Sequence, residues 1–186
     1  GFKQLTAGKS KLVAITPKDF QNPDYKRHDS LGLNFRSNEF CSAVALAQFE
    51  RVDELVALRR EIGKLYDKVF EDTEFEPQTV PRGYSSSYFS YAVKSPFRST
   101  KEWKGFYDHH LGNGGDDFYA MMAIAYTEPV MSDLGYHEKF KGTCPVAEQI
   151  QPRNMLFKTN YRDIQEAIKH TEVLRQSVED FKKGKA

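Results

Sequence analysis

The sequence has few cysteines, no excess of charge of one sign and no long apolar run. Its two cysteines, Cys41 and Cys144, are too few for a disulfide scaffold and are typical of a reducing cytosol. The 27 lysines and arginines are interspersed with 26 aspartates and glutamates, which argues against a nucleic-acid partner. Uncharged runs such as residues 118–127 are far shorter than the ~20 apolar residues that span a membrane. We therefore expect a cytoplasmic protein with neither a nucleic-acid nor a membrane partner.

Histidine and glycine are present, but not in the patterns of a metal site or a phosphate loop. His109 and His110 are adjacent, so they point apart on a helix, and no cysteine or carboxylate stands at a fixed ligand spacing from them or from His137. The glycine-rich residues 112–117 lack the Lys-Ser/Thr pair of a phosphate loop and follow a predicted helix instead of leading into one. We expect a turn there and no metal in the protein.

The composition is that of an ordinary globular protein, with 39% hydrophobic and 28% charged residues. A chain of 186 residues can form one sizeable core, or a domain and a half. Over residues 38–70, apolar side chains recur at helical spacing with no proline between them, and Ser37 is a candidate N-cap. The pattern predicts one helix or a bent helix pair of roughly thirty residues, a length that often connects two domains.

Beyond residue 70 the sequence predicts shorter elements. In chain order they are a strand over 86–93, a helix over 100–111 begun by a Ser99–Glu102 capping box, a strand or short buried helix over 118–126, and a C-terminal helix capped by Asn160 with Asp163 at its N3 position. Strands alternating with helices after a long helix indicate a small α/β domain.

The first residues place a lysine beside a tight turn. Lys3 precedes a Thr-Ala-Gly turn ending at Gly8, and the apolar residues 12–16 are expected to form a buried strand. Gly8 lets the backbone approach a cofactor closely, and apolar surroundings lower the pKa of an amine, which makes it a nucleophile and proton carrier. A lysine near a terminus is usually a solvated side chain, but this setting favours a Schiff-base lysine.

This opening, with three later motifs, resembles the DegT/DnrJ/EryC1/StrS family of sugar aminotransferases, which have the fold of type I pyridoxal-phosphate enzymes. The segment at Lys3 is similar to the family's Lys-x-x-Thr-x-Gly-Glu-Gly-Gly, except that Lys9-Ser10-Lys11 replaces the last Glu-Gly-Gly. The later motifs are Gly32-x-Asn34-x-Arg36, the alanines Ala43 and Ala47 with Gln48 ahead of Arg59-Arg60, and Pro145-Val-Ala-Glu148. The resemblance covers nearly the whole chain.

The resemblance implies pyridoxal phosphate as cofactor and Lys3 as the catalytic Schiff-base lysine, which also moves a proton between substrate and cofactor. It implies that Asn34 reaches the cofactor phosphate of the neighbouring subunit, and Arg36 could offer a two-pronged set of hydrogen bonds to phosphate or carboxylate. Without the resemblance, Asn34 and Arg36 would be read as the cap and solvated start of a helix. Dehydratase members carry histidine in place of the lysine, so Lys3 favours amino transfer.

By the same resemblance, residues 1–37 end the large cofactor-binding domain, 38–70 form a connecting helix and 71–186 form the small C-terminal α/β domain. The implied activity transfers an amino group from glutamate or glutamine to a keto sugar, nucleotide-linked, or to a related cyclic ketone. Most of the cofactor site is expected upstream of residue 1, so we expect a homodimer or a companion chain carrying the N-terminal half. The alternative is a non-catalytic partner subunit or a structural paralogue.

The aromatic residues before and within the predicted strand over 86–93 are candidates for a substrate wall. Tyr88 and Tyr91 could stack on a sugar or nucleotide ring, together with the polar loop 112–117. Aromatic residues in a strand more often fill a core or pair across strands, and this alternative stays open.

Overall fold

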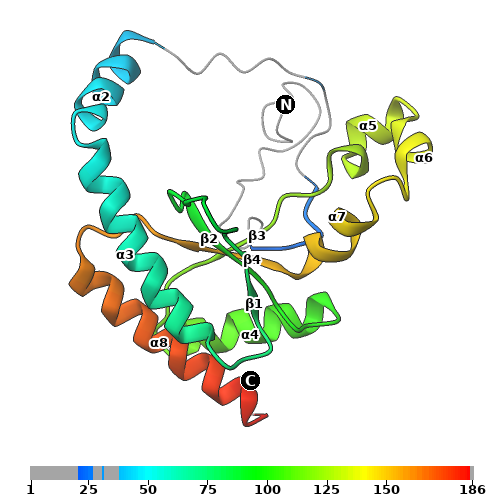
Figure 1. Cartoon of the computed structure of the whole chain (residues 1–186). Helices are drawn as coiled ribbons and strands as arrows, with labels where there is room; N and C mark the ends of the chain where they lie inside the picture. Colours follow the sequence, from blue (N-terminus) through cyan, green and yellow to red (C-terminus); the bar gives the residue numbers. More distant parts are fainter. Residues whose placement is uncertain (1–20, 27–30, 32–37, 185–186) are drawn as a thin grey trace.

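The computed structural model describes residues 21–26, 31 and 38–184, and its centre is a four-stranded antiparallel sheet in the order β1-β2-β4-β3. Helices α3, α8 and α4 gather on one side of this sheet (Figure 1). The described part of the chain thus combines helices with a sheet, which confirms the mixed α/β architecture predicted from the sequence. No helix in the described part is both long and apolar enough to cross a membrane, and no three potential metal ligands are grouped there.

The sheet consists of β1 (Glu76–Pro77), β2 (Ser90–Lys94), β3 (Tyr119–Ala120) and β4 (Asn154–Lys158). In β2 and β4 every second residue is buried, and Tyr91 lies opposite Phe157 while Val93 lies opposite Met155. Paired residues share a face, so these four side chains form the sheet's half of the core. The predicted strand over 86–93 is wrong for residues 86–89, which are irregular, and the sequence analysis missed β4.

Two helices, α2 (Glu39–Phe49) and α3 (Val52–Phe70), follow each other with a break at Glu50 and Arg51, which confirms the expected bent pair. The N-cap of α2 is Asn38, whose side chain accepts the Cys41 N–H at 2.9 Å, so the prediction of Ser37 is wrong. Helix α3 buries one apolar stripe, whereas α2 is apolar almost all round and has no buried residue. Nothing in the described part of the chain covers α2.

Helices α4 (Thr100–Gly112) and α8 (Ile164–Lys182) begin at side-chain caps. Ser99 accepts the Glu102 N–H at 3.2 Å, which confirms the predicted start of α4. Asp163 accepts the Glu166 N–H at 2.9 Å and is the N-cap of α8. The prediction that Asn160 caps this helix is therefore wrong by three residues. Asn160 and Asp163 are both suitable capping residues and stand about one helical turn apart, so the sequence alone does not distinguish them.

Between β3 and β4 the chain forms only short helices: η1 (Ala125–Thr127), α5 (Pro129–Asp133), α6 (Tyr136–Phe140), α7 (Pro145–Ile150) and η2 (Gln151–Arg153). The expected strand or helix over 118–126 is therefore reduced to the two residues of β3 and the start of η1. Glu148 of α7 anchors the region, because its carboxylate accepts hydrogen bonds from the Tyr126 hydroxyl and, at 2.7 Å, from the Gly142 N–H. These bonds lower the pKa of the Glu148 carboxyl.

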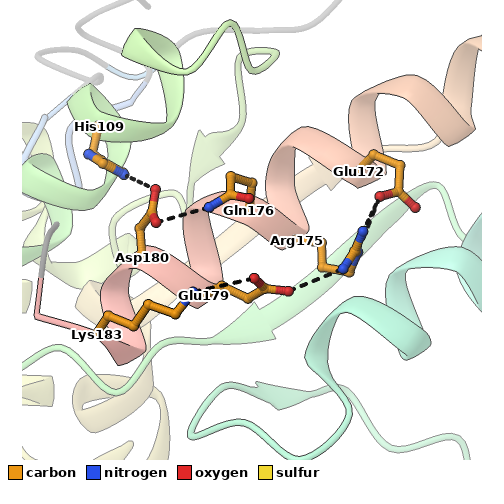
Figure 2. A network of polar contacts seen from close by, with 7 residues as sticks. All are labelled: His109, Glu172, Arg175, Gln176, Glu179, Asp180 and Lys183. Atoms are coloured by element: carbon orange, nitrogen blue, oxygen red, sulfur yellow. Dashed lines mark hydrogen bonds and ion pairs between the residues drawn. The ribbon is translucent and has the colours of Figure 1, made fainter.

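A network of polar side chains joins the last turns of α8 to α4 (Figure 2). The Asp180 carboxylate contacts His109 Nε2 at 3.1 Å and accepts a hydrogen bond from Gln176 at 2.9 Å. Arg175 bridges Glu172 and Glu179 along the outer side of α8. The Arg175 pairs are exposed and lie within α8, so each contributes little to stability. The two helices are held together by the contact of Asp180 with His109 and by the buried residues beneath it.

One of those buried residues is a histidine, His110, which is 2% exposed. Its Nδ1 lies 3.0 Å from the Ser177 hydroxyl of α8, and a Cβ added to Gly115 would lie 2.2 Å from its ring. The glycine therefore lets the turn after α4 close over the imidazole. Burial, opposed by a hydrogen bond to the Asp116 backbone and the Asp116 charge, lowers the pKa of His110 to about 4.

We expect the buried His110 to make the folded state sensitive to acid. The pKa in the fold, about 4, is lower than the ordinary 6.5, so its contribution to stability is complete above pH 6.5 and falls as the pH drops towards 4. The loss should approach about 3 kcal/mol. Urea unfolding at pH 7 and pH 4 measures it, with His110→Phe as the control that cannot titrate. Equal losses in the two proteins would contradict the assignment.

Candidate functional site

The residues predicted to hold the cofactor, Lys3, Asn34 and Arg36, lie outside the described residues. The buried strand expected over 12–16 lies outside them too. The structure does describe both residues of the predicted substrate wall, Tyr88 and Tyr91, which border the same hollow. The candidate site is therefore built from that hollow.

The hollow encloses about 230 Å³ beside β2, at the point where an irregular segment enters the strand. Its lining residues carry hydroxyl, amide, aromatic and small apolar groups: Gln78, Thr79, Val80, Pro81, Tyr84, Ser85, Ser86, Tyr88, Ser90, Tyr91 and Ala92. None of them is ionisable near neutral pH. The hollow can therefore accept hydrogen bonds and offer ring faces, but it has no charge to attract a phosphate or a carboxylate.

Tyr88 stands at the wall of the hollow in an uncommon backbone conformation. Its φ is +46°, in the left-handed region that non-glycine residues rarely occupy. Its ring lies against α3 at Gly63, where an added Cβ would come within 2.9 Å of the ring. The ring is half-buried, and burial followed by the charge of Asp67 raises the pKa of its hydroxyl.

Tyr91, by contrast, is 3% exposed and lies at the edge of the core. Its ring stacks between those of Tyr66 and Tyr88, with centroids 4.9 and 5.8 Å away. Its hydroxyl donates to Asp67 of α3 at 2.5 Å. Burial and this hydrogen bond raise the pKa of Tyr91, so the hydroxyl stays protonated. Tyr91 thus supports the wall that Tyr88 presents to the hollow.

The polar loop 112–117 does not reach the hollow, although the sequence analysis placed it beside the substrate. Asp117 accepts a hydrogen bond from the Tyr107 hydroxyl at 2.7 Å. Asp116 forms an ion pair with Lys158, whose ammonium also lies 4.8 Å from the centre of the Tyr161 ring. Both carboxylates already have partners within the domain, so the loop serves packing between α4 and β4.

Neither region fits pyridoxal phosphate. The hollow has no lysine to bind the aldehyde and no cation to hold the phosphate. Lys158 is already engaged by Asp116 and the Tyr161 ring. The side chains of the hollow and of the loop 112–117 with Lys158 therefore do not form a cofactor site.

The residues that hold the wall of the hollow from the helix side were not predicted from the sequence. They are Arg59, Arg60 and Gly63 of α3, with Thr159 after β4. The adjacent arginines were visible in the sequence, but nothing local indicated that they would face a segment 25 or more residues further along the chain.

The arrangement of this sheet and its helices is shared with solved sugar aminotransferases. A putative sugar aminotransferase of Streptococcus pneumoniae, Spr1654 in its PLP form, superposes with a TM-score of 0.55 at 16% identity, covering 73% of this chain and 34% of that one. Helicobacter pylori PseC, an aminotransferase of pseudoaminic acid biosynthesis, gives 0.55 at 22% identity over 82% and 40%. The chain therefore has the fold of the matched part of these enzymes, as the sequence predicted.

Residues 11–170 match the DegT/DnrJ/EryC1/StrS aminotransferase family, and the chain belongs to that family. The GDP-perosamine synthase of Escherichia coli O157:H7 is 28% identical over 123 residues, which are 66% of this chain and 31% of that protein. The Vibrio cholerae GDP-perosamine synthase is 29% identical over 62 residues, 33% of this chain and 17% of that protein. The chain thus spans at most about a third of these curated relatives. The resemblance is confirmed, and Lys3 precedes the matched residues.

Proposed function

We propose that this chain is the C-terminal part of a pyridoxal-phosphate-dependent aminotransferase that moves an amino group from glutamate or glutamine to a nucleotide-linked keto sugar or related cyclic ketone. The observation that carries the proposal is the family match over residues 11–170. The names of the relatives support the substrate class, since perosamine is an amino sugar and PseC acts in pseudoaminic acid biosynthesis. A sugar ketone also suits a hollow that has hydroxyl, amide and aromatic groups and no charge.

In this proposal Lys3 binds the cofactor aldehyde and carries the proton between substrate and cofactor. Asn34 and Arg36 hold phosphate or carboxylate, with Asn34 acting across a two-fold interface in a homodimer. The cofactor supplies the electron sink that makes the proton transfer possible. The described residues bind and orient the acceptor, chiefly through the Tyr88 ring and the hydroxyls beside it.

The proposal is tested on the complete protein, in which this chain is purified together with the N-terminal half, by supplying it with pyridoxal phosphate, glutamate or glutamine, and a panel of nucleotide-linked keto sugars. Formation of the oxo acid together with an amino sugar, followed by mass spectrometry, would support it. Absence of both products from a protein whose absorbance spectrum shows bound cofactor would reject the substrate class. Absence of bound cofactor would instead favour a non-catalytic subunit or paralogue.

Replacing Tyr88 by phenylalanine should weaken binding of the acceptor alone. The variant keeps the ring but removes a hydroxyl worth one hydrogen bond, so we expect the acceptor KM to rise about 3- to 10-fold. The half-reaction with the amino donor should stay unchanged, because the donor does not use the hollow. Tyr136→Phe, on α6 away from the hollow, is the matched control. Equal slowing of both half-reactions would contradict an acceptor-specific role.

A further inference from the structure

The wall of the hollow is an irregular segment, residues 84–89. Contacts within this segment are too few to stabilise its conformation. Its local hydrogen bonds are few: Tyr88 N–H donates to the Ser86 hydroxyl within the segment, and Tyr84 N–H donates to the carbonyl of Pro81 just before it. The left-handed conformation of Tyr88 lies higher in energy for a tyrosine than the extended one that would continue β2. Something outside the segment must therefore stabilise it.

Arg59 of α3 supplies most of that stabilisation. Its Nη1 carries two hydrogens: it donates to the Thr159 hydroxyl at 2.7 Å, and the carbonyls of Tyr88 and Phe89 share its other N–H at 3.3 and 3.2 Å. Thr159 is 1% exposed, and its hydroxyl in turn donates to the Tyr88 carbonyl at 2.5 Å. The carbonyl of the strained residue is thus held by two donors, one of them charged.

Arg60 and Gly63 complete the contact along the same helix. Arg60 Nε donates to the Ser86 carbonyl at 3.0 Å, and its Nη2 lies 3.3 Å from the Ser85 hydroxyl. Gly63, one turn further on from Arg59, leaves the space that the Tyr88 ring fills. Three neighbouring positions of α3 therefore fix the backbone on both sides of Tyr88 and the place of its ring.

We propose that Arg59, assisted by Arg60, is a positioning residue for the acceptor hollow: it holds the Tyr88 backbone so that the ring forms the wall against which the acceptor ring binds. The inference rests on the proposed function, since it takes the hollow as the acceptor's place. The guanidinium suits this place because the two N–H bonds of its Nη1 are fixed in the plane of the group, whereas the ammonium of lysine rotates freely at the end of a flexible stem. Without this group, residues 86–89 would relax and the wall would be lost.

Arg59→Lys tests the inference in the holoenzyme, with Arg175→Lys as the matched control on the surface of α8, where the arginine pairs only with Glu172 and Glu179. Amide hydrogen exchange of the peptide covering 84–90 should be about 10-fold faster in Arg59→Lys, with no change in β4 or α4. The acceptor KM should rise about 10-fold while the donor half-reaction keeps its rate. Arg60→Lys should show smaller increases in the exchange of residues 84–90 and in the acceptor KM. It replaces Arg59→Lys in the test if that variant does not fold.

Three results would overturn the role of Arg59: unchanged exchange over 84–90, faster exchange with an unchanged acceptor KM, or equal loss in both half-reactions. The control Arg175→Lys should match the unchanged protein in every measurement. Exchange is recorded without substrate, so it separates this inference from the proposed function. If the protein without substitutions binds the cofactor but aminates none of the sugars, the proposed function is contradicted. This holds whatever the hydrogen-exchange rates of the variants are.

Discussion

Lys3→Ala should abolish amino transfer, with a loss of about 10⁴-fold or more. In the proposed mechanism this amine both binds the cofactor and moves the proton, so one substitution removes two functions that no described side chain can supply. Among the described residues, the lining of the hollow contains no amine, and Lys158 is engaged by Asp116. Steady-state rates of oxo-acid formation, with cofactor in excess, measure the loss.

Two lysines in the same segment provide matched controls. Lys9→Ala and Lys11→Ala remove the same charge a few residues further on and should keep activity within about 3-fold, since they replace positions where the family has Glu-Gly-Gly. Borohydride reduction of the unchanged holoenzyme should attach the cofactor to the peptide that contains Lys3. A reduced adduct on any other lysine, or full activity in Lys3→Ala, would refute the assignment.

The helices could be predicted from sequence because their signals are local. The periodic apolar residues of α3 and the Ser99–Glu102 cap of α4 lie within one or two turns of the features they define. The same logic misplaced the start of α8, since Asn160 and Asp163 are both good caps and only packing selects one. Local sequence signals therefore predicted which helices form, but they misplaced some of the residues at which the helices begin.

The strands were harder because their partners are distant. The alternation of residues 86–93 continues through Tyr88, but the chain leaves the sheet there because Arg59 and Gly63, more than 20 residues earlier, hold another conformation. β4 is five residues long, and its pairing with β2 joins positions 60 or more residues apart. Neither contact has a local signal.

The residues of the candidate site also differ in how far the sequence could predict their place. The predicted cofactor residues Lys3, Asn34 and Arg36 could be named because they stand in motifs that resemble those of the family. Their roles stay predictions. Tyr88 and Tyr91 were named from residue type alone, which could not distinguish a wall from a core. Both border the hollow, but the structure gives them different surroundings: the half-buried Tyr88 lies against Gly63 of α3, whereas Tyr91 is buried and hydrogen-bonded to Asp67.

Phe118→Ala should destabilise the domain more than any surface change. The ring is fully buried, and its centroid lies 4.8 Å from Phe157, 5.1 Å from Tyr107 and 5.2 Å from Trp103. It thus joins the sheet to α4, and its removal leaves a cavity between rigid rings that cannot easily collapse. We expect a loss of about 3–5 kcal/mol in the free energy of unfolding, a large share of the ~5–15 kcal/mol of a typical domain.

Phe89→Ala is the matched control for this substitution, because the Phe89 side chain is 90% exposed and should change stability by no more than about 0.5 kcal/mol. Phe118→Leu, which keeps most of the volume, should cost less than the alanine variant. Urea unfolding of the three variants at pH 7 gives the comparison, with the cofactor omitted so that ligand binding does not add to stability. If Phe118→Ala lost no more than Phe89→Ala, the aromatic cluster around Phe118 would not be the contact that joins α4 to the sheet.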